Sequence, residues 1–367
     1  RVEGHFMAVE PRVAVVGPLP PPSGGMANQC RQLVRLMESE GIPMELVRTN
    51  APYRPTWVGG IPVLRAFARL LPYIWTLWRA AGRNQIFHIF ANSGWAWHLF
   101  AAPAVVIGRL RGVKIIVNYR GGNAEPFLRT TTPYVVRMLG AVDRLVTPSG
   151  FLKDVFARFG LQAQIVSNIV DLTRFRARER DSTDAPHLIV TRNLEPIYDI
   201  PTAIRAYARV RSHYPAARLT VAGTGPDLAK CELLAQGLGV ADGVRFAGRI
   251  DNDQIPELYA SADVALNPST VDNMPISILE AYGSGVPVVT TDVGGIPYIA
   301  IHDRTALLVR PGDDVAMAAS VCRLLGDSAL VNRLVEAGQT EARAYAWPHV
   351  KEQWLAVYRS VLDTPVR

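Results

Sequence analysis

The 367-residue sequence predicts an α/β protein with two domains, each built on a parallel sheet covered by helices. Two observations lead to this fold class. Apolar runs of strand length alternate with helix-length periodic segments along the chain, as in βαβ units. The chain is also longer than one average domain, which has about 100 to 200 residues. The linker is expected at 174–186, where Arg, acidic residues, Ser and Thr replace the apolar runs.

The first domain is expected over 7–180. It opens with a strand at 12–16, because this apolar run is followed by a turn rich in Gly and Pro. A helix is expected at 28–41, with apolar residues such as Leu33 on one face and Gly41 at its end. The remaining expected elements are strands at 44–48, 86–90, 114–119 and 144–147 and a helix at 96–111.

The second domain is expected over 181–345 and the last segment, 346–367, as a helix that crosses back to the first domain. Trp354 and Tyr358 lie one turn apart on the apolar face of that helix. Ligands of parallel sheets bind outside the carboxyl ends of the strands, so we expect the two domains to face each other across a binding cleft. The expected elements of the second domain are strands at 187–191, 218–223, 244–247, 264–267 and 286–290 and helices at 201–213 and around 278–285.

The cysteine pattern argues against disulfides and metal sites. Cys30, Cys231 and Cys322 stand singly with no His cluster beside them, so we expect neither a disulfide nor a metal site. This pattern favours a reducing, cytoplasmic compartment. Residues 1–10 lack the apolar core of a secretory signal, and no apolar run reaches the roughly 18 residues of a membrane span. Any association with a membrane is therefore expected to be peripheral.

Basic residues are concentrated in the first half of the chain. Residues 1–183 contain 23 Lys and Arg against 11 Asp and Glu, whereas 184–367 contain 16 against 21. Between Glu45 and Glu125 no residue is acidic and ten are basic. Such a surplus predicts an anionic partner, which could be a membrane surface, a nucleic acid or an acidic substrate.

The densest group of functional candidates lies at 267–287. Asp272 is placed in a loop after an expected strand, and Glu280 follows eight positions later on an expected helix. Glu280 could accept hydrogen bonds from a ribose diol, and Asp272 could face a sugar hydroxyl. The alternative is a helix whose acids only stabilise its positive end. Backbone N–H groups at a helix start bind phosphates, so the candidate donor-binding segment is the expected helix start, made of Asn273, Met274, Pro275, Ile276 and Ser277.

This segment resembles the nucleotide-sugar loop of glycosyltransferase family 4, a retaining family with the GT-B fold of two Rossmann-like domains. Further motifs resemble those of the family in the same order, and together they span about residues 12–345. They are the glycine loop that ends at Gly24 and Gly25, the signatures at Ser149, Asn168 and Asp171, the turns at Gly223–Pro226, Phe246–Arg249 and Thr291–Gly295, and the strand and turn at Leu307–Asp313.

The resemblance implies roles for the matching residues. Glu280 would bind the nucleotide ribose, Asp272 would contact the transferred sugar, and Arg192 would bind the donor diphosphate, because a guanidinium suits phosphate oxygens. A surface salt bridge is the alternative for Arg192. Gly223 is placed at the same donor site.

Gly24 and Gly25 could bring backbone amides close to the donor diphosphate or to an acceptor. The structural alternative is a tight turn from strand to helix, and both interpretations can hold together.

The chain departs from the family pattern at three places. Asp272 stands where Glu is usual, Ile197 and Tyr198 stand where the family has a Lys, and Arg120 stands where it has a His. One interpretation is that Arg120 replaces the positive charge missing beside the leaving diphosphate. The other is an impaired or non-catalytic homologue.

Within the acid-free stretch, 61–79 mixes bulky apolar residues with arginines. Segments of this composition are typical of membrane interfaces, where apolar side chains enter the headgroup layer and cations meet anionic lipid. The alternative is a helix packed into the core. No nucleic-acid-binding signature accompanies the charge, so no nucleic-acid partner is expected. The candidate membrane or acceptor residues are Arg65, Arg69, Trp75, Trp78 and Arg79.

We therefore expect a retaining hexosyltransferase that moves a sugar from a nucleotide sugar to a lipid-linked acceptor in the synthesis of a cell-surface polysaccharide or glycoconjugate. A polyprenyl diphosphate carrier would be both anionic and membrane-embedded, which places the protein at the inner face of the cell membrane. Arg192, Asp272 and Arg120 are the candidate catalytic residues, and no cofactor or metal is expected. The alternatives are a nucleotide-sugar epimerase or hydrolase and a non-catalytic nucleotide-sugar-binding membrane subunit.

Overall fold

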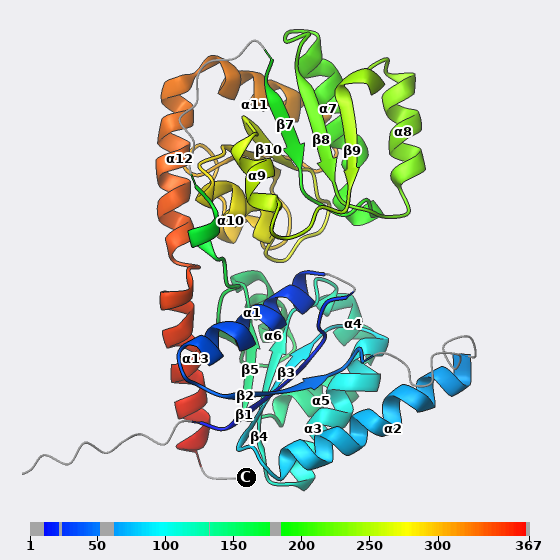
Figure 1. Ribbon diagram of the computed structural model, residues 1–367, viewed down its shortest axis with the longest axis vertical. Coiled ribbons are helices and arrows are strands. Elements are labelled where there is room, and N and C mark those ends of the chain that lie inside the picture. The colour runs from blue at the N-terminus through cyan, green and yellow to red at the C-terminus, as the bar shows by residue number, and fades with distance from the viewer. Residues whose placement is uncertain (1–10, 22–23, 52–61, 132, 177–184, 365–367) are drawn as a thin grey trace, which may run out of the picture. The chain divides into compact units, whose positions relative to one another are not determined.

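The computed structural model describes residues 11–21, 24–51, 62–131, 133–176 and 185–364. The chain forms two compact units: Val170–Trp347 makes one, and the segments before and after it make the other (Figure 1). Each unit has its own parallel sheet with helices on it, so the predicted α/β class is confirmed.

The first unit is built on six parallel strands in the order β2-β1-β3-β4-β5-β6. Both β3 and β4 are buried along their whole length, because helices cover the two faces of the sheet. The strands are β1 (Val13–Gly17), β2 (Met44–Arg48), β3 (Ile86–Ala91), β4 (Lys114–Tyr119), β5 (Arg144–Thr147) and β6 (Gln164–Ile165).

Two helices of this unit differ from the sequence prediction. The first begins at Gly25 rather than at residue 28, because Gly24 is extended and its carbonyl already accepts the first helical bond from the Asn28 amide at 2.9 Å. The helix predicted at 96–111 opens with a π-helical turn. The helices are α1 (Gly25–Ser39), α2 (Pro62–Ala81), η2 (Trp97–Ala101, the π turn), α3 (Ala102–Leu110), α4 (Ala124–Thr131), α5 (Tyr134–Gly140) and α6 (Gly150–Arg158).

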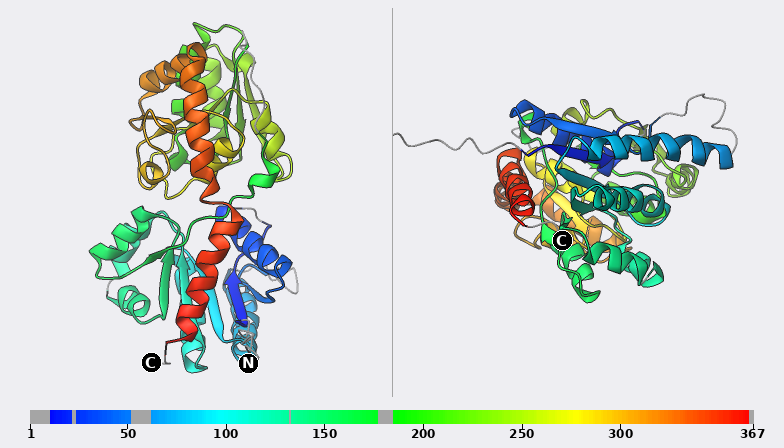
Figure 2. Two further views of the ribbon diagram at one scale, coloured as in Figure 1. Left: turned by 90° about the vertical axis from the view of Figure 1, so that its left-hand side faces the viewer. Right: turned by 90° about the horizontal axis from the view of Figure 1, so that it is seen from below.

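The last helix, α13 (Trp347–Leu362), packs almost entirely within the first unit. Figure 2 shows it crossing the sheet of that unit. The Trp354 ring centre lies 4.3 Å from that of the buried His88, and the Tyr358 hydroxyl is 2.8 Å from His88 Nδ1. Buried aromatic contacts therefore attach the end of the chain to strand β3.

The second unit has six parallel strands in the order β12-β11-β10-β7-β8-β9. They are β7 (His187–Val190), β8 (Arg218–Ala222), β9 (Val244–Gly248), β10 (Val264–Asn267), β11 (Val288–Thr291) and β12 (Leu307–Val309). Its helices are α7 (Ile200–Arg211), α8 (Leu228–Gly237), α9 (Ile255–Ala260), α10 (Ile276–Gly283), α11 (Asp314–Gly326) and α12 (Ser328–Arg343), with single 3₁₀ turns η3 (Leu172–Arg174), η4 (Pro196–Tyr198), η5 (Ala241–Gly243) and η6 (Ile296–Tyr298).

The order of strands reverses at one point in each sheet. In the second unit β7 lies between β8 and β10, and in the first unit β1 lies between β2 and β3. Loops that leave neighbouring strands in opposite directions open a crevice at the carboxyl ends of those strands, where ligands of such sheets bind. The loops after β7 and β10, and those after β1 and β3, are therefore the places to look for a site.

Candidate functional site

The loops after β7 and β10 bring Arg192 and Asp272 together. A guanidinium nitrogen of Arg192 donates to Asp272 Oδ2, and the two side chains are only 14% and 9% exposed. The other carboxylate oxygen of Asp272 accepts the backbone N–H of Asn273 at 2.9 Å. Arg192 and Asp272, which are 80 positions apart in the sequence, thus form one partly buried ion pair at the strand-order reversal.

An aromatic ring also contacts the flat face of the Arg192 guanidinium. The centre of its guanidinium lies 4.1 Å from the centre of the Tyr198 ring, in a cation–π arrangement. Tyr198 ends the turn η4, and the amide of Thr270 donates to the carbonyl of Ile197 in that turn at 2.8 Å. Tyr198 and Asp272 therefore fix Arg192 from two loops, although Arg192 Nε is buried with no partner among the described residues.

The start of α10 carries no side-chain cap. Pro275 occupies the capping position and cannot supply one, and the buried Ser277 Oγ has no hydrogen-bond partner among the described residues. An eight-residue helix that starts without a side-chain cap, beside the Arg192 guanidinium, is suited to bind an anion such as a phosphate. This region contains Asn273, Met274, Pro275, Ile276 and Ser277, as the sequence predicts.

Glu280 lies one turn further along α10. Its Oε2 accepts a hydrogen bond of 3.3 Å from the hydroxyl of Tyr259, which is wholly buried. Burial raises the pKa of Glu280 to about 7, while the Tyr259 hydroxyl and the charges of Arg174 and Arg192 lower it. The carboxyl group is therefore near the midpoint of its titration at neutral pH.

Glycines in the turns after β8 and β11 let those turns pack closely against the Arg192 and Asp272 loops. A Cβ on Gly223, which has φ of +158°, would stand 2.1 Å from the carbonyl oxygen of Arg192. A Cβ on Gly295 would stand 1.6 Å from the carbonyl oxygen of Asn273, and the Gly295 amide donates to Asp272 O at 2.9 Å. The glycines thus place the backbone of the Arg192 and Asp272 loops, and Gly223 acts on the site through Arg192.

The candidates of the first unit lie at the start of α1 and just after β4. Gly25 begins α1 after β1, and an added Cβ at Gly24 or Gly25 would meet nothing within 4 Å. Arg120, just after β4, donates to Gln29 Oε1 on α1 at 3.5 Å and to Asn118 Oδ1 at 3.4 Å. Burial lowers the pKa of Arg120 to about 10, so it stays positively charged at neutral pH. Arg120 and the glycine turn therefore lie at the same edge of this sheet.

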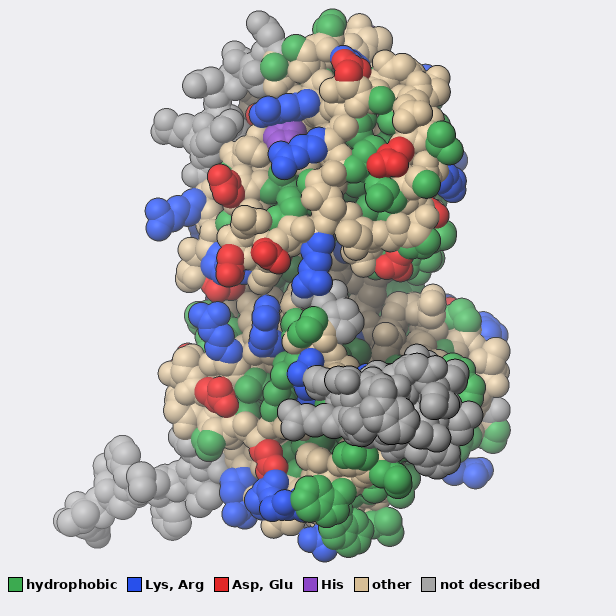
Figure 3. All heavy atoms as spheres, turned by 45° about the vertical axis from the view of Figure 1, so that its right-hand side comes forward, with side chains coloured by type: hydrophobic (Ala, Val, Ile, Leu, Met, Phe, Trp, Pro, Cys, Tyr) green, Lys and Arg blue, Asp and Glu red, His purple; other side chains and the backbone are tan. Residues whose placement is uncertain are grey.

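The membrane candidates lie on α2, and the neighbouring helix α3 also has exposed apolar side chains. Trp75 and Trp78 are 60% and 46% exposed, and the guanidinium of Arg79 lies over the Trp75 ring at 4.6 Å. Figure 3 shows hydrophobic side chains beside Lys and Arg on the lower part of the first unit. Arg69 is half-buried, and Arg65 falls outside the residues whose side chains are described.

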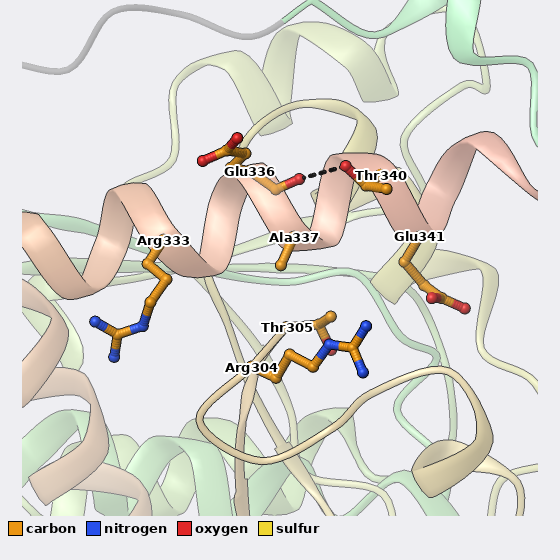
Figure 4. Close-up of a pocket in the computed structure, with 7 residues that line it drawn as sticks. All are labelled: Arg304, Thr305, Arg333, Glu336, Ala337, Thr340 and Glu341. Carbon is orange, nitrogen blue, oxygen red and sulfur yellow. Dashed lines mark hydrogen bonds between the residues drawn. The ribbon is translucent and has the colours of Figure 1, made fainter.

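A cavity of about 300 Å³ lies elsewhere on the second unit, between α12 and the turn that contains Arg304 (Figure 4). It includes none of the predicted donor residues. Its arginines are accompanied by two carboxylates, so its lining has no surplus of either charge. The lining residues are Arg304, Thr305, Arg333, Glu336, Ala337, Thr340 and Glu341.

Over the described residues, no three side chains of His, Cys, Asp or Glu come close enough together to hold a metal ion. Within those ranges, no helix is both long and apolar enough to cross a bilayer.

Sequence reasoning missed Tyr259 and the role of Tyr198. Tyr259 belongs to the six-residue helix α9, which has too few turns to produce a periodic pattern. Tyr198 was noted only as a departure from a family pattern, whereas it contacts Arg192 directly.

Comparison with known proteins agrees with this architecture. Residues 23–174 match the family described as Glycosyltransferase Family 4, and residues 172–341 match Glycosyl transferases group 1. The Anabaena protein HepE, solved in complex with UDP-glucose, superposes with a TM-score of 0.73 at 16% identity, over 95% of this chain and 99% of that one. The fold is therefore the GT-B fold of glycosyltransferases.

Sequence relatives define the family. The D-inositol 3-phosphate glycosyltransferase of Salinispora arenicola is 30% identical over 314 residues, which are 76% of this chain and 69% of that protein. The exopolysaccharide phosphotransferase SCO2592 of Streptomyces coelicolor is 29% identical over 247 residues, which are 66% of this chain but only a quarter (25%) of that longer protein. The chain belongs to glycosyltransferase family 4, as the motifs predict.

Proposed function

We propose that the protein is a retaining glycosyltransferase that takes a hexose from a nucleoside-diphosphate sugar. The observation that supports this most is the grouping of Arg192, Asp272 and Glu280 around the uncapped start of α10, at the strand-order reversal. A cation and helix amides suit the diphosphate, and carboxylates suit the hydroxyls of ribose and sugar. The likeness to HepE, which was solved with UDP-glucose, supports a nucleotide sugar as the donor.

The proposed chemistry retains the anomeric configuration, as the family resemblance implies. The bond between the anomeric carbon and the diphosphate oxygen breaks, and the diphosphate leaves with the electron pair. The acceptor hydroxyl oxygen bonds to the anomeric carbon on the same face, and its proton passes to an oxygen of the departing diphosphate. Arg192 and the amides of α10 stabilise the charge on the leaving group. Asp272 gives up part of its pairing with Arg192 and turns to the sugar.

Transfer of label tests this proposal. Radiolabelled glucose conjugates of UDP, GDP and ADP are incubated with the protein and a membrane lipid extract, and the anomeric configuration of the product is read by NMR. We expect label in lipid with retained configuration, and its loss by at least about 100-fold in Glu280→Ala. Glu336→Ala, an exposed carboxylate on α12, is the matched control and should transfer normally.

Two results would contradict the proposal and identify an alternative. Tight binding of a sugar nucleotide without turnover would indicate a binding subunit. Free sugar or an epimerised nucleotide sugar, formed without any acceptor, would indicate a hydrolase or an epimerase on the same fold.

We also propose that the acceptor is lipid-linked and that the protein works at an anionic membrane surface. The support is a surface that we call the α2–α3 patch, made of exposed apolar side chains with arginines stacked on two of them. Arg111 lies over Trp78 at 4.7 Å, as Arg79 lies over Trp75. Cations held beside indole rings suit the headgroup layer. The apolar members are Leu71, Trp75, Trp78, Val106 and Leu110.

Sedimentation with vesicles tests the patch. Arg79→Glu with Arg111→Glu should reduce binding to phosphatidylglycerol vesicles by about 10-fold or more, because each cation near an anionic surface contributes about 1 kcal/mol. Leu233→Ala with Leu238→Ala, two exposed apolar residues of the second unit, serves as the control. Wild-type binding of the charge-reversed variant would reject the membrane surface while leaving the donor proposal untouched.

A further inference from the structure

The hydroxyl of Tyr259 is a polar group deep in the second unit to which the proposed reaction assigns no role. The residue is wholly buried on α9, beneath α10 and the end of β7. Its oxygen lies 2.7 Å from Thr191 Oγ1, 2.9 Å from the carbonyl of Ser277 and 3.3 Å from Glu280 Oε2. One phenol oxygen therefore joins Glu280 to the residue immediately before Arg192.

The donors and acceptors at this point can be counted. A phenol has one proton to donate, and the Ser277 carbonyl can only accept. Thr191 is then the donor to the Tyr259 oxygen. When Glu280 is charged, the phenol proton is drawn to its carboxylate. When Glu280 is neutral, its own proton can be donated to the Tyr259 oxygen while the phenol proton goes to Ser277.

We propose that Tyr259 is a positioning residue for donor binding: its hydroxyl holds one carboxylate oxygen of Glu280, so that the other is presented to the ribose diol of the nucleotide sugar. This rests on the proposed role of Glu280. Because Tyr259 can either donate to or accept from Glu280, the carboxyl group keeps a buried partner in both protonation states.

A consequence is that donor binding is linked to a proton. Diol hydroxyls donate to a carboxylate, so they favour its charged form. The groups that act on Glu280 are Tyr259, Arg174 and Arg192, and burial outweighs them and raises its pKa to about 7. Affinity for the donor should therefore fall as the pH drops below about 7. Loss of the Tyr259 hydrogen bond, which lowers this pKa, should move that fall to higher pH.

The experiment compares two tyrosines that differ in their partners. UDP, GDP and ADP are first screened by calorimetry, and the one that binds the wild type is titrated between pH 5.5 and 8.5. In Tyr259→Phe we expect affinity at pH 7 to fall by about 3- to 10-fold and the pH midpoint to rise. Tyr282→Phe is the control, because Tyr282 is also buried and donates to Thr305 Oγ1 at 3.0 Å, away from Glu280.

Each outcome bears on one proposal. A wild-type midpoint and affinity in Tyr259→Phe, with binding lost in Glu280→Ala, would overturn the positioning role and leave the donor site standing. Unchanged binding in Glu280→Ala would instead remove the proposed function. Glu280→Gln should bind weakly and without the pH dependence. Thr191→Val provides a second route if Tyr259→Phe does not fold, and should shift the midpoint in the same direction by a smaller amount.

Discussion

The guanidinium of Arg192 lies over the ring of Tyr198, with 4.1 Å between their centres. The family usually has a lysine at or beside this position. In this chain an aromatic ring stands there instead, and it holds Arg192 in place rather than adding a second cation. The arrangement also removes bulk water from one face of the guanidinium, which strengthens its attraction for a phosphate.

Removal of the ring should therefore impair the reaction. In Tyr198→Ala we expect transfer to slow by about 2- to 30-fold, the range that corresponds to a cation–π contact of about 0.5–2 kcal/mol. Tyr198→Phe keeps the ring and should be close to wild type. Steady-state kinetics measure this, with Ile197→Ala in the same turn as the control. Equal effects of the Ala and Phe variants would show that the hydroxyl, and not the ring, is what matters.

Loss of the carboxylate of Asp272 should separate binding from transfer. In Asp272→Asn, Arg192 is left without its anionic partner, so a nucleoside diphosphate should bind at least as tightly as in the wild type, because its phosphates supply the missing charge. The free energy of unfolding without ligand should fall by about 1–3 kcal/mol. Transfer should slow by about 100-fold, since the sugar contact is lost. Calorimetry and label transfer check the two effects, and weaker nucleotide binding would refute the explanation.

A substitution at the start of α1 can test whether a ligand lies against the backbone there. Gly25→Ala adds a Cβ that meets no protein atom within 4 Å, so the fold should be unchanged or up to about 1 kcal/mol more stable. A ligand that lies against this backbone would meet the methyl group, and transfer should fall. Gly237→Ala on α8, where an added Cβ also has open space, should stabilise without loss of transfer. Full activity of Gly25→Ala would mean that the glycine only forms the turn.

Buried His88 predicts a pH dependence of stability. Arg120 can only donate, so Asn118 Oδ1 accepts from it and the Asn118 amide nitrogen faces His88 Nε2 at 3.0 Å. His88 is then neutral, with Nδ1–H donating to Tyr358. Burial, and then the charge of Arg120, lower the pKa of His88 to about 3.

Below pH 6.5 the unfolded chain binds a proton at His88 that the native protein does not. Stability should therefore fall by about 1.4 kcal/mol per pH unit from this residue alone. The free energy of unfolding is measured with urea at pH 7.5 and at pH 5.5. The loss of this free energy between the two pH values should be about 1.4 kcal/mol smaller in His88→Gln than in the wild type. The same substitution at the exposed His213 should leave the change as it is, and identical pH dependence in all three proteins would contradict the assignment.

Much of the fold could be predicted because parallel strands covered on both faces appear as continuous apolar runs. The strands at 44–48, 114–119, 144–147 and 264–267 occupy the predicted residues. Helix starts were less predictable. The first helix was expected from residue 28, but the extended Gly24 lets α1 begin three residues earlier. The short helix α9 left no periodic signal.

The sequence by itself determined the fold class, the family and the residues that surround the start of α10, because strand pattern, glycine turns and the spacing of Asp272 and Glu280 are local properties of the chain. The tertiary structure alone decided which of them touch. Arg192 meets Asp272 across 80 positions, and Tyr259 meets both Thr191 and Glu280. The physical reason is that the strand order places β7 beside β10, and burial then makes each polar group there depend on partners that are distant in the sequence.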